Sequence, residues 1–132
     1  MANITIGAKN EQTVLVTSEI AISFLGLEAA RVLATPEMIR LMEQTCRRMV
    51  LPMLDEGHDT VGTHVNVYHL AGAPMGASVR FTAEITGVEG RRVQFKVEAH
   101  GEREKIGEGT HERGIINIAK FAARLAEKLE KK

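Results

Sequence analysis

Residues 36 to about 51 form a strongly amphipathic helical pattern, and this segment constrains the fold of the chain more than any other. At 100° per residue, apolar and small side chains gather on one broad arc, while three arginines and Gln44 fill the opposite one. The side chains of the first arc are Met38, Ile39, Leu41, Met42, Thr45, Cys46, Met49 and Val50. A helix of this length extends for about 24 Å. We therefore expect a long helix with one face buried against another layer of structure.

The ends of this helix are marked by residues with known positional preferences. Thr35 is expected to be the N-cap and Pro36 the first helical residue, where the missing N–H of proline is not needed. Glu37 complements the positive end of the helix dipole. Pro52, followed by Gly57, ends the helix.

Strand-like runs precede and follow the helix. A first strand is expected at Thr13–Thr17, and four more runs lie at residues 61–69, 79–86, 92–100 and 105–118. Their period-two alternation predicts an antiparallel sheet with one covered face. In the run 61–69, the expected covered face consists of Val61, Val65, Val67 and His69.

Turns and glycines divide the sheet region further. Glu89-Gly90 and Gly101-Glu102 are expected to form hairpin turns. Gly107 and Gly109 allow a bulge or a close backbone approach in the last strand.

Two segments complete the organisation of the chain. Residues 119–132 predict a terminal amphipathic helix with its apolar face at Phe121, Ala122, Leu125 and Leu129. Residues 18–34 have a mixed pattern, compatible with a short helix or a flap. One long helix against one antiparallel sheet is a two-layer α+β fold. We expect a single domain over residues 1–132, without repeats or linkers.

Composition excludes several classes of function. Seventeen basic and seventeen acidic residues cancel, so the chain has no charge excess for nucleic acid or an anionic membrane. Cys46 is the only cysteine, which excludes an intramolecular disulfide and fits a reducing compartment. The N-terminus has no signal-peptide pattern, and the apolar stretch 20–34 is too short and too charged to span a bilayer. We expect a cytoplasmic protein.

Three polar residues stand where partial burial is expected and could carry chemistry. Thr35 either only caps the helix or offers a hydroxyl at a helix N-terminus, where negative charge is stabilised. Glu43 lies at the border of the apolar arc, as an exposed partner for Arg47 or as a half-buried carboxylate. His69 is either a hydrogen-bonded core histidine or a general acid–base. A hydroxyl, a carboxylate and an imidazole are the groups that acyl transfer needs.

Other candidates are weaker. His64 and His111 would have to join His69 to bind a metal, and no close ligand spacing supports this. Gly107-Glu108-Gly109 lacks the Gly-Lys-Ser/Thr of a phosphate loop. Arg113 is either a phosphate clamp or a sheet-edge charge paired with Glu112.

Five motifs in order carry a resemblance to a known family. They are Leu33-Ala34-Thr35-Pro36-x-Met38, Leu41-Met42-Glu43-x-Thr45-Cys46, Val61-Gly62-Thr63-His64-Val65, His69-Leu70-Ala71-x-x-Pro74-x-Gly76 and Ile106-Gly107-Glu108-Gly109-Thr110-His111-Glu112-Arg113. Together they resemble the fluoroacetyl-CoA thioesterase-like branch of the hotdog-fold thioesterases, over roughly residues 12–125. The resemblance implies an antiparallel sheet wrapped around a long central helix. It also implies a homodimer with active sites at the subunit interface.

The resemblance assigns roles to five residues. The catalytic threonine, glutamate and histidine of the family correspond to Thr35, Glu43 and His69. The family glycine near the reacting carbonyl corresponds to Gly62, and the arginine of the last strand to Arg113. The implied reaction is hydrolysis of a small acyl-CoA to a carboxylic acid and CoA, with Glu43 orienting His69 or acting as base. No metal or redox cofactor is needed.

The resemblance does not extend to every feature. Residues 24–31 contain one aromatic residue, Phe24, where a dedicated fluoroacetyl pocket would carry more. The fluoroacetyl specificity is therefore not transferred. Two alternatives remain on the same fold: a dimer that binds an acyl-CoA or small metabolite without catalysis, and a hydratase or dehydratase. The sequence has no separate aspartate–histidine motif for the second.

Overall fold

The computed structural model describes residues 3–24 and 26–130. In chain order the elements are β1 (Lys9–Leu15), β2 (Ala21–Ile22), the 3₁₀ turn η1 (Glu28–Ala30), β3 (Val32–Leu33), α1 (Thr35–Val50), the 3₁₀ turn η2 (Leu51–Met53), β4 (His58–His69), β5 (Ser78–Glu89), β6 (Arg92–His100), β7 (Lys105–Asn117) and α2 (Ile118–Glu130). The predicted strand–helix–meander–helix order is confirmed, although β1 starts before the predicted strand.

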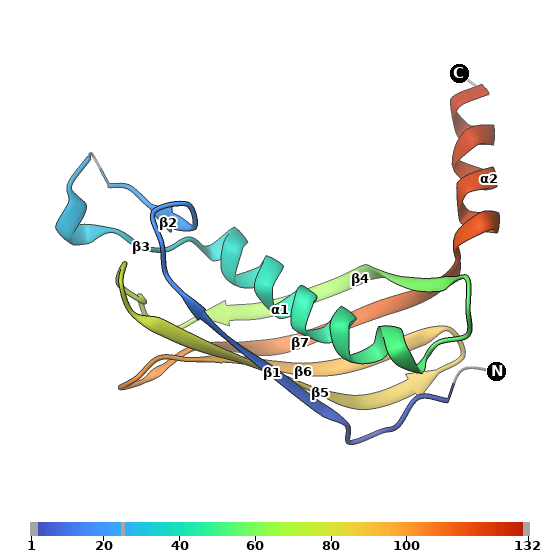
Figure 1. The fold of residues 1–132 in the computed structure, drawn as a ribbon, viewed down its shortest axis with the longest axis horizontal. Coiled ribbons are helices and arrows are strands. Elements are labelled where there is room, and N and C mark those ends of the chain that lie inside the picture. The colour runs from blue at the N-terminus through green and yellow to red at the C-terminus, as the bar shows by residue number, and fades with distance from the viewer. Residues whose placement is uncertain (1–2, 25, 131–132) are drawn as a thin grey trace.

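The main sheet has five antiparallel strands in the order β1-β5-β6-β7-β4. The long helix α1 crosses one face of this sheet diagonally (Figure 1). Strand β4 is therefore at one edge, and α2 extends away from the sheet at the end of β7 (Figure 1). The arrangement is the predicted two-layer α+β fold.

The apolar arc of α1 forms the centre of the core. The buried residues of the helix are Met38, Leu41, Met42, Thr45, Cys46, Met49 and Val50, whereas Ile39 is half-buried. They meet the inward side chains of the sheet, of which Phe81, Ile85 and Phe95 are large and fully buried. Burial of each such side chain contributes about 1.5–3 kcal/mol, so this contact fixes the position of α1 on the sheet.

Close packing of β7 against α1 and β4 depends on two glycines. A Cβ atom at Gly107 would lie 2.7 Å from the sulfur of Met38 and 2.9 Å from the carbonyl oxygen of Tyr68. A Cβ atom at Gly109 would collide with the backbone of β4 at Asn66. The prediction that these two glycines allow a close backbone approach is confirmed.

A β-bulge in β4 changes which residues face α1. Gly62 pairs with Arg113 and His64 pairs with Glu112, so Thr63 is the extra residue. An extra residue shifts the side-chain alternation by one, and Thr60 and Gly62 face the helix on the N-terminal side of the bulge. The predicted grouping of Val61 with Val65, Val67 and His69 is therefore wrong for Val61.

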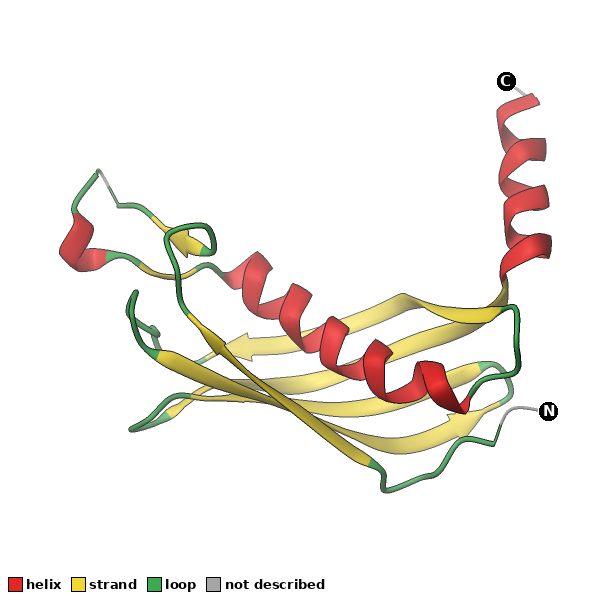
Figure 2. Cartoon of the chain, in the orientation of Figure 1, coloured by secondary structure: helices red, strands yellow, loops and turns green. Residues whose placement is uncertain are grey.

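The segment before α1 is neither a single helix nor unstructured. Strands β2 and β3 form a small antiparallel hairpin, with η1 between them (Figure 2). Ala34 is the N-cap of α1 and Thr35 is its first residue, without a side-chain capping bond. The prediction of Thr35 as N-cap is thus wrong, because its hydroxyl contacts another element.

The tail forms the predicted helix, with residues 131–132 outside the described part of the chain. Phe121 is half-buried, whereas Ala122, Leu125 and Leu129 of the predicted apolar face are exposed. Among residues 3–24 and 26–130, no helix is both long and apolar enough to span a membrane.

Candidate active site

The first polar cluster joins the start of α1 to the end of β4. The Oγ1 atom of Thr35 lies 2.7 Å from Nδ1 of His69. Two of the three residues singled out in the sequence are therefore in direct contact, although 34 positions separate them. Pairing of β4 with β7 places His69 beside Gly107, the glycine over which Met38 packs. The helix start and the strand end are thus held in register by the core.

The environment of His69 favours its neutral form. Burial lowers the pKa of His69 below its ordinary value of 6.5, and the nearby backbone of Ala71 partly opposes this effect. A neutral imidazole has one ring nitrogen that accepts a proton, as a general base must. The Nε2 atom of His69 is buried and has no hydrogen-bond partner among the described residues. One ring nitrogen is thus paired with Thr35 and the other is left for a further group.

The second cluster surrounds Glu43 in the middle of α1. The Oε2 atom of Glu43 lies 3.3 Å from Nη1 of Arg113 and 3.8 Å from Nε2 of His111. A Cβ atom at Gly62 would lie 2.6 Å from Oε2 of Glu43, so the carboxylate rests against the glycine backbone. Three of the predicted site residues, Glu43, Gly62 and Arg113, therefore meet at one point.

Arg113 is almost fully buried and rigidly held. Its Nε donates to Oγ1 of Thr60 at 2.7 Å, and its Nη2 donates to the Thr60 carbonyl at 3.0 Å. Burial lowers the pKa of Arg113, and the Glu43 carboxylate opposes this effect. The guanidinium therefore presents Nη1 to Glu43 in a fixed orientation, which excludes its interpretation as a sheet-edge charge paired with Glu112.

His111 supports the same arginine. Its Nδ1 lies 2.7 Å from the carbonyl oxygen of His64 and its Nε2 lies 3.2 Å from Nη1 of Arg113. A carbonyl only accepts and a guanidinium only donates, so Nδ1 carries the proton and the ring is neutral. Burial lowers the pKa of His111, and the charge of Arg113 lowers it further. Both ring nitrogens are therefore in use, which leaves neither for a metal.

A metal site has no further support in the structure. No group of three or more histidine, cysteine, aspartate or glutamate residues with metal-binding geometry lies within residues 3–24 and 26–130. His69 faces Thr35, whereas His111 faces Arg113.

The two clusters are separate within one chain. Thr35 and Glu43 are eight residues apart on α1, a rise of about 12 Å. His69 and Gly62 are seven residues apart on β4, or roughly 20 Å. The polar contacts of Glu43 in the described chain are with Arg113 and His111. Glu43 and His69 are therefore not in contact within one chain, and the role of Glu43 in orienting His69 or acting as base stays a prediction.

Two residues of the second cluster escaped the sequence analysis. Thr60 was hidden because the bulge at Thr63 reverses the apparent parity of β4. His111 was considered only as a metal ligand, although it lies two residues before Arg113 on β7 and so shares its face. That spacing was the available signal for a His111–Arg113 pair.

Comparisons with known proteins agree with this arrangement of helix and sheet. The family model of the fluoroacetyl-CoA-specific thioesterase, FlK, matches residues 16–119. A fluoroacetyl-CoA thioesterase of Streptantibioticus cattleyicolor is 44% identical over 101 residues, which cover 76% of this chain and 73% of the relative.

Solved structures give the same result. A structure of the fluoroacetyl-CoA thioesterase FlK aligns with a TM-score of 0.85 and 36% identity, covering 96% of this chain and 98% of the other. A thioesterase superfamily member of Thermus thermophilus aligns with a TM-score of 0.88 and 37% identity over 100% of both chains. The hotdog fold that the motifs implied is thereby confirmed.

Proposed function

The chain belongs to the fluoroacetyl-CoA-specific thioesterase family and is a thioester hydrolase, and from this premise we propose that it hydrolyses a small acyl-CoA to a carboxylic acid and CoA. A solved structure of the relative FlK contains fluoroacetate and CoA, and another contains acetyl-CoA. The observation that carries the proposal is the 2.7 Å contact between Thr35 and His69.

The Thr35–His69 pair supplies the proton transfer. With the ring proton on Nε2, Nδ1 of His69 accepts the proton of the Thr35 hydroxyl, directly or through the attacking water. In the covalent route, Thr35 Oγ1 bonds to the thioester carbon, the C–S bond breaks, and His69 protonates the leaving thiolate of CoA. Water then cleaves the acyl ester and restores the hydroxyl. In the direct route, the same pair activates water for a single attack.

The start of α1 stabilises the negative charge that develops on the thioester oxygen. Thr35 is the first residue of this 16-residue helix. Pro36 has no N–H and the N–H of Met38 bonds the Ala34 carbonyl, which leaves the N–H groups of Thr35 and Glu37 without a partner within the helix. These groups and the positive end of the helix dipole stabilise an oxyanion. Loss of one such donor typically reduces kcat by about 10²–10³.

We place the complete site between two copies of the chain. Strand β4 has twelve residues and pairs only with β7 in the described part of the chain, so its other edge is open. Val65, Tyr68 and Leu70 are exposed along or just beyond it, at 41%, 64% and 53%. A long open edge with apolar side chains is a surface that a second β4 strand can cover.

Antiparallel pairing of two β4 strands would unite the clusters. With the bulge at Thr63 counted as one extra residue, a twofold axis at Asn66 brings Gly62 of one copy opposite His69 of the other. Both residues are on the face of β4 that carries α1, because they pair with Arg113 and Gly107 of β7. Glu43 of one copy then approaches Nε2 of His69 of the other. A carboxylate there would complete a threonine–histidine–glutamate arrangement.

The test is hydrolysis of a panel of acyl-CoAs, read by release of free thiol. Burial raises the pKa of the Cys46 thiol to about 12, so the protein itself does not react with the reagent. The proposal requires His69→Ala and Glu43→Gln to reduce the rate on the best substrate by at least about 10². Tight CoA-ester binding without turnover would favour a binding protein instead. Mass spectrometry of rapidly quenched enzyme separates the two routes, because an acyl group on Thr35 marks the covalent one.

A further inference from the structure

A small hollow lies at the base of α2, away from both polar clusters. Its volume is about 230 Å³. It lies where η2 leads into β4, where β6 begins and where β7 passes into α2. The residues that line it are Leu54, Asp55, His58, Arg91, Ile115, Asn117, Lys120 and Arg124.

The hollow has a local excess of positive charge in a chain whose net charge is zero. Arg91, Lys120 and Arg124 face one acid, Asp55, which gives +3 − 1 = +2 with His58 neutral. None of the three cations forms an ion pair within residues 3–24 and 26–130. Three unpaired cations at one concave place form a binding surface for an anion.

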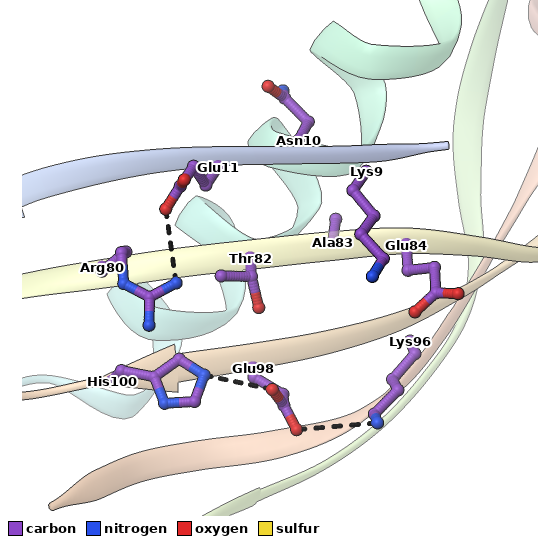
Figure 3. A pocket seen from close by; sticks show the side chains of 10 residues that line it. All are labelled: Lys9, Asn10, Glu11, Arg80, Thr82, Ala83, Glu84, Lys96, Glu98 and His100. Carbon is purple, nitrogen blue, oxygen red and sulfur yellow. Dashed lines mark hydrogen bonds and ion pairs between the residues drawn. The ribbon is translucent and has the colours of Figure 1, made fainter. Parts of the chain in front are cut away.

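A second hollow on the outer face of the sheet provides a contrast. It has a volume of about 600 Å³ and also contains many charged residues (Figure 3). There Arg80 pairs with Glu11 at 3.3 Å, and Lys96 pairs with Glu98 at 3.8 Å (Figure 3). Neighbouring acids thus neutralise these cations in place, which is not the case at the base of α2.

The start of α2 adds to the positive potential of the smaller hollow. Asn117, which lines it, accepts the backbone N–H of Lys120 at 3.1 Å and so caps the helix. The 13 residues of α2 direct the positive end of their dipole to this point. The three cations and the start of α2 therefore lie at the same hollow.

We propose that this hollow binds a phosphate group of the CoA part of the substrate; this rests on the proposed function. A volume of about 230 Å³ is below the roughly 300–1,000 Å³ of pockets for drug-sized ligands, so it fits one end of a larger molecule. Arginine recognises phosphate by paired hydrogen bonds, and lysine adds a point charge.

The position of the hollow suits a substrate whose thioester lies near Gly62. His58, the first residue of β4, lines the hollow and precedes Gly62 by four residues, or about 13 Å along the strand. The extended pantetheine arm of CoA can bridge this distance. The acyl group would then meet Glu43, Gly62 and Arg113 of the copy that holds the phosphate, together with Thr35 and His69 of the other copy.

The experiment compares two thioesters of the same acyl group: the CoA ester and the pantetheine ester, which has no phosphate. The variant combines Arg91→Gln with Arg124→Gln, and Arg91→Gln alone is the milder alternative if the pair reduces folding. Lys128→Gln is the matched control, because Lys128 is an exposed cation of α2 outside the hollow. All variants are first compared by thermal unfolding.

The ratio of kcat/KM for the CoA ester to that for the pantetheine ester is expected to fall at least about tenfold in the double variant, because the loss of one charge-assisted hydrogen bond alone costs about tenfold. Lys128→Gln should leave the ratio within about twofold of wild type, as a distant, solvent-screened charge would. An unchanged ratio in the hollow variants, or an equal fall in Lys128→Gln, overturns the proposal.

A binding experiment makes the hollow testable apart from catalysis. Calorimetry with adenosine 3′,5′-bisphosphate should show binding that Arg91→Gln weakens about tenfold and Lys128→Gln does not. Equal binding in both variants, or inorganic phosphate binding as tightly as the nucleotide, contradicts the assignment to CoA. If the wild-type protein hydrolyses neither thioester, the proposed function is wrong. The calorimetry then still shows whether the hollow binds the phosphate groups of the nucleotide.

Discussion

The hydroxyl of Thr35 lies 2.7 Å from Nδ1 of His69, which links the first residue of α1 to the last residue of β4. A threonine at a helix start usually caps the helix, but this one forms no capping bond. The hydroxyl of Thr35 therefore contacts His69 instead of capping α1. This contact predicts measurable effects on the catalytic rate, on the pH dependence of the rate and on the assembly of the site from two chains.

Removal of the hydroxyl should affect catalysis far more than folding. Thr35→Ala is expected to lower kcat by about 10²–10⁴, since in the proposed reaction His69 would lose its proton donor. Thr35→Ser should retain much of the rate. Because Thr35 makes no capping bond, the free energy of unfolding of Thr35→Ala should change by less than about 1 kcal/mol. Steady-state kinetics and chemical denaturation check both parts, and a wild-type kcat in Thr35→Ala contradicts the assignment.

The pH–rate profile should have an acidic limb below pH 6.5. Burial lowers the pKa of His69, so its imidazole stays neutral and able to accept a proton until the pH falls below that ordinary value. The rate should therefore be level near pH 7 and decline as the pH falls through the lowered pKa. Measurement of kcat/KM from about pH 5 to 8 tests this. A limb centred above pH 6.5 is incompatible with His69 as the base.

The two preceding predictions concern Thr35 and His69, which were identified from the sequence. They could be identified because the pattern of neighbouring residues places each of them at the end of an element. Helical and strand periodicity placed Thr35 at a helix start and His69 at a strand end, and both positions are correct to within one residue. The short-range pattern also located the core face of α1. The short-range pattern could not predict the contact between Thr35 and His69, because it depends on how α1 packs against the sheet that contains β4.

The side chain at position 62 controls the place of the Glu43 carboxylate. A methyl group in Gly62→Ala would occupy space 2.6 Å from Oε2 of Glu43, and the carboxylate can move because it ends a flexible side chain. We expect kcat to fall at least about tenfold, with a small change in stability. Gly87→Ala is the matched control, because its Cβ atom would likewise press on a side-chain end, that of Gln94, at another bulge. Equal kinetic effects of the two variants would show that Gly62 has no special role.

The second cluster shows where sequence reasoning fails. The bulge at Thr63 reverses the alternation of β4, so Thr60 and Gly62 face α1 although Val61 has the parity of Val65 and Val67. Gly62, beside the inserted Thr63, was the only local sign of a bulge, and a single strand glycine does not show where the alternation changes. The hydrogen bonds between Arg113 and Thr60 could therefore be found only once the pairing of β4 with β7 was known.

Protein stability should depend on pH through the buried histidines. Burial lowers the pKa of His111 in the folded state, so the unfolded state binds more protons between that pKa and 6.5. The free energy of unfolding should consequently decrease as the pH falls below 6.5, by up to about 1.4 kcal/mol per pH unit for one such group. His111→Gln should reduce this slope. Urea denaturation at several pH values measures it, and a slope in His111→Gln equal to that of wild type would refute the effect.

Mixed dimers test whether each active site is assembled from two copies of the chain. Thr35→Ala and Glu43→Gln chains with different tags are co-expressed, and the heterodimer is isolated through both tags. If each site combines Thr35 and His69 of one copy with Glu43 of the other, one of the two sites is intact.

The mixed dimer of Thr35→Ala and Glu43→Gln should then regain about half of the wild-type rate, although each homodimer is nearly inactive. A dimer of Thr35→Ala and His69→Ala is the control and should stay inactive, because both changes fall in the same half of the site. A Thr35→Ala/Glu43→Gln heterodimer that is as inactive as its parents, or a failure of the two chains to associate, would contradict the account.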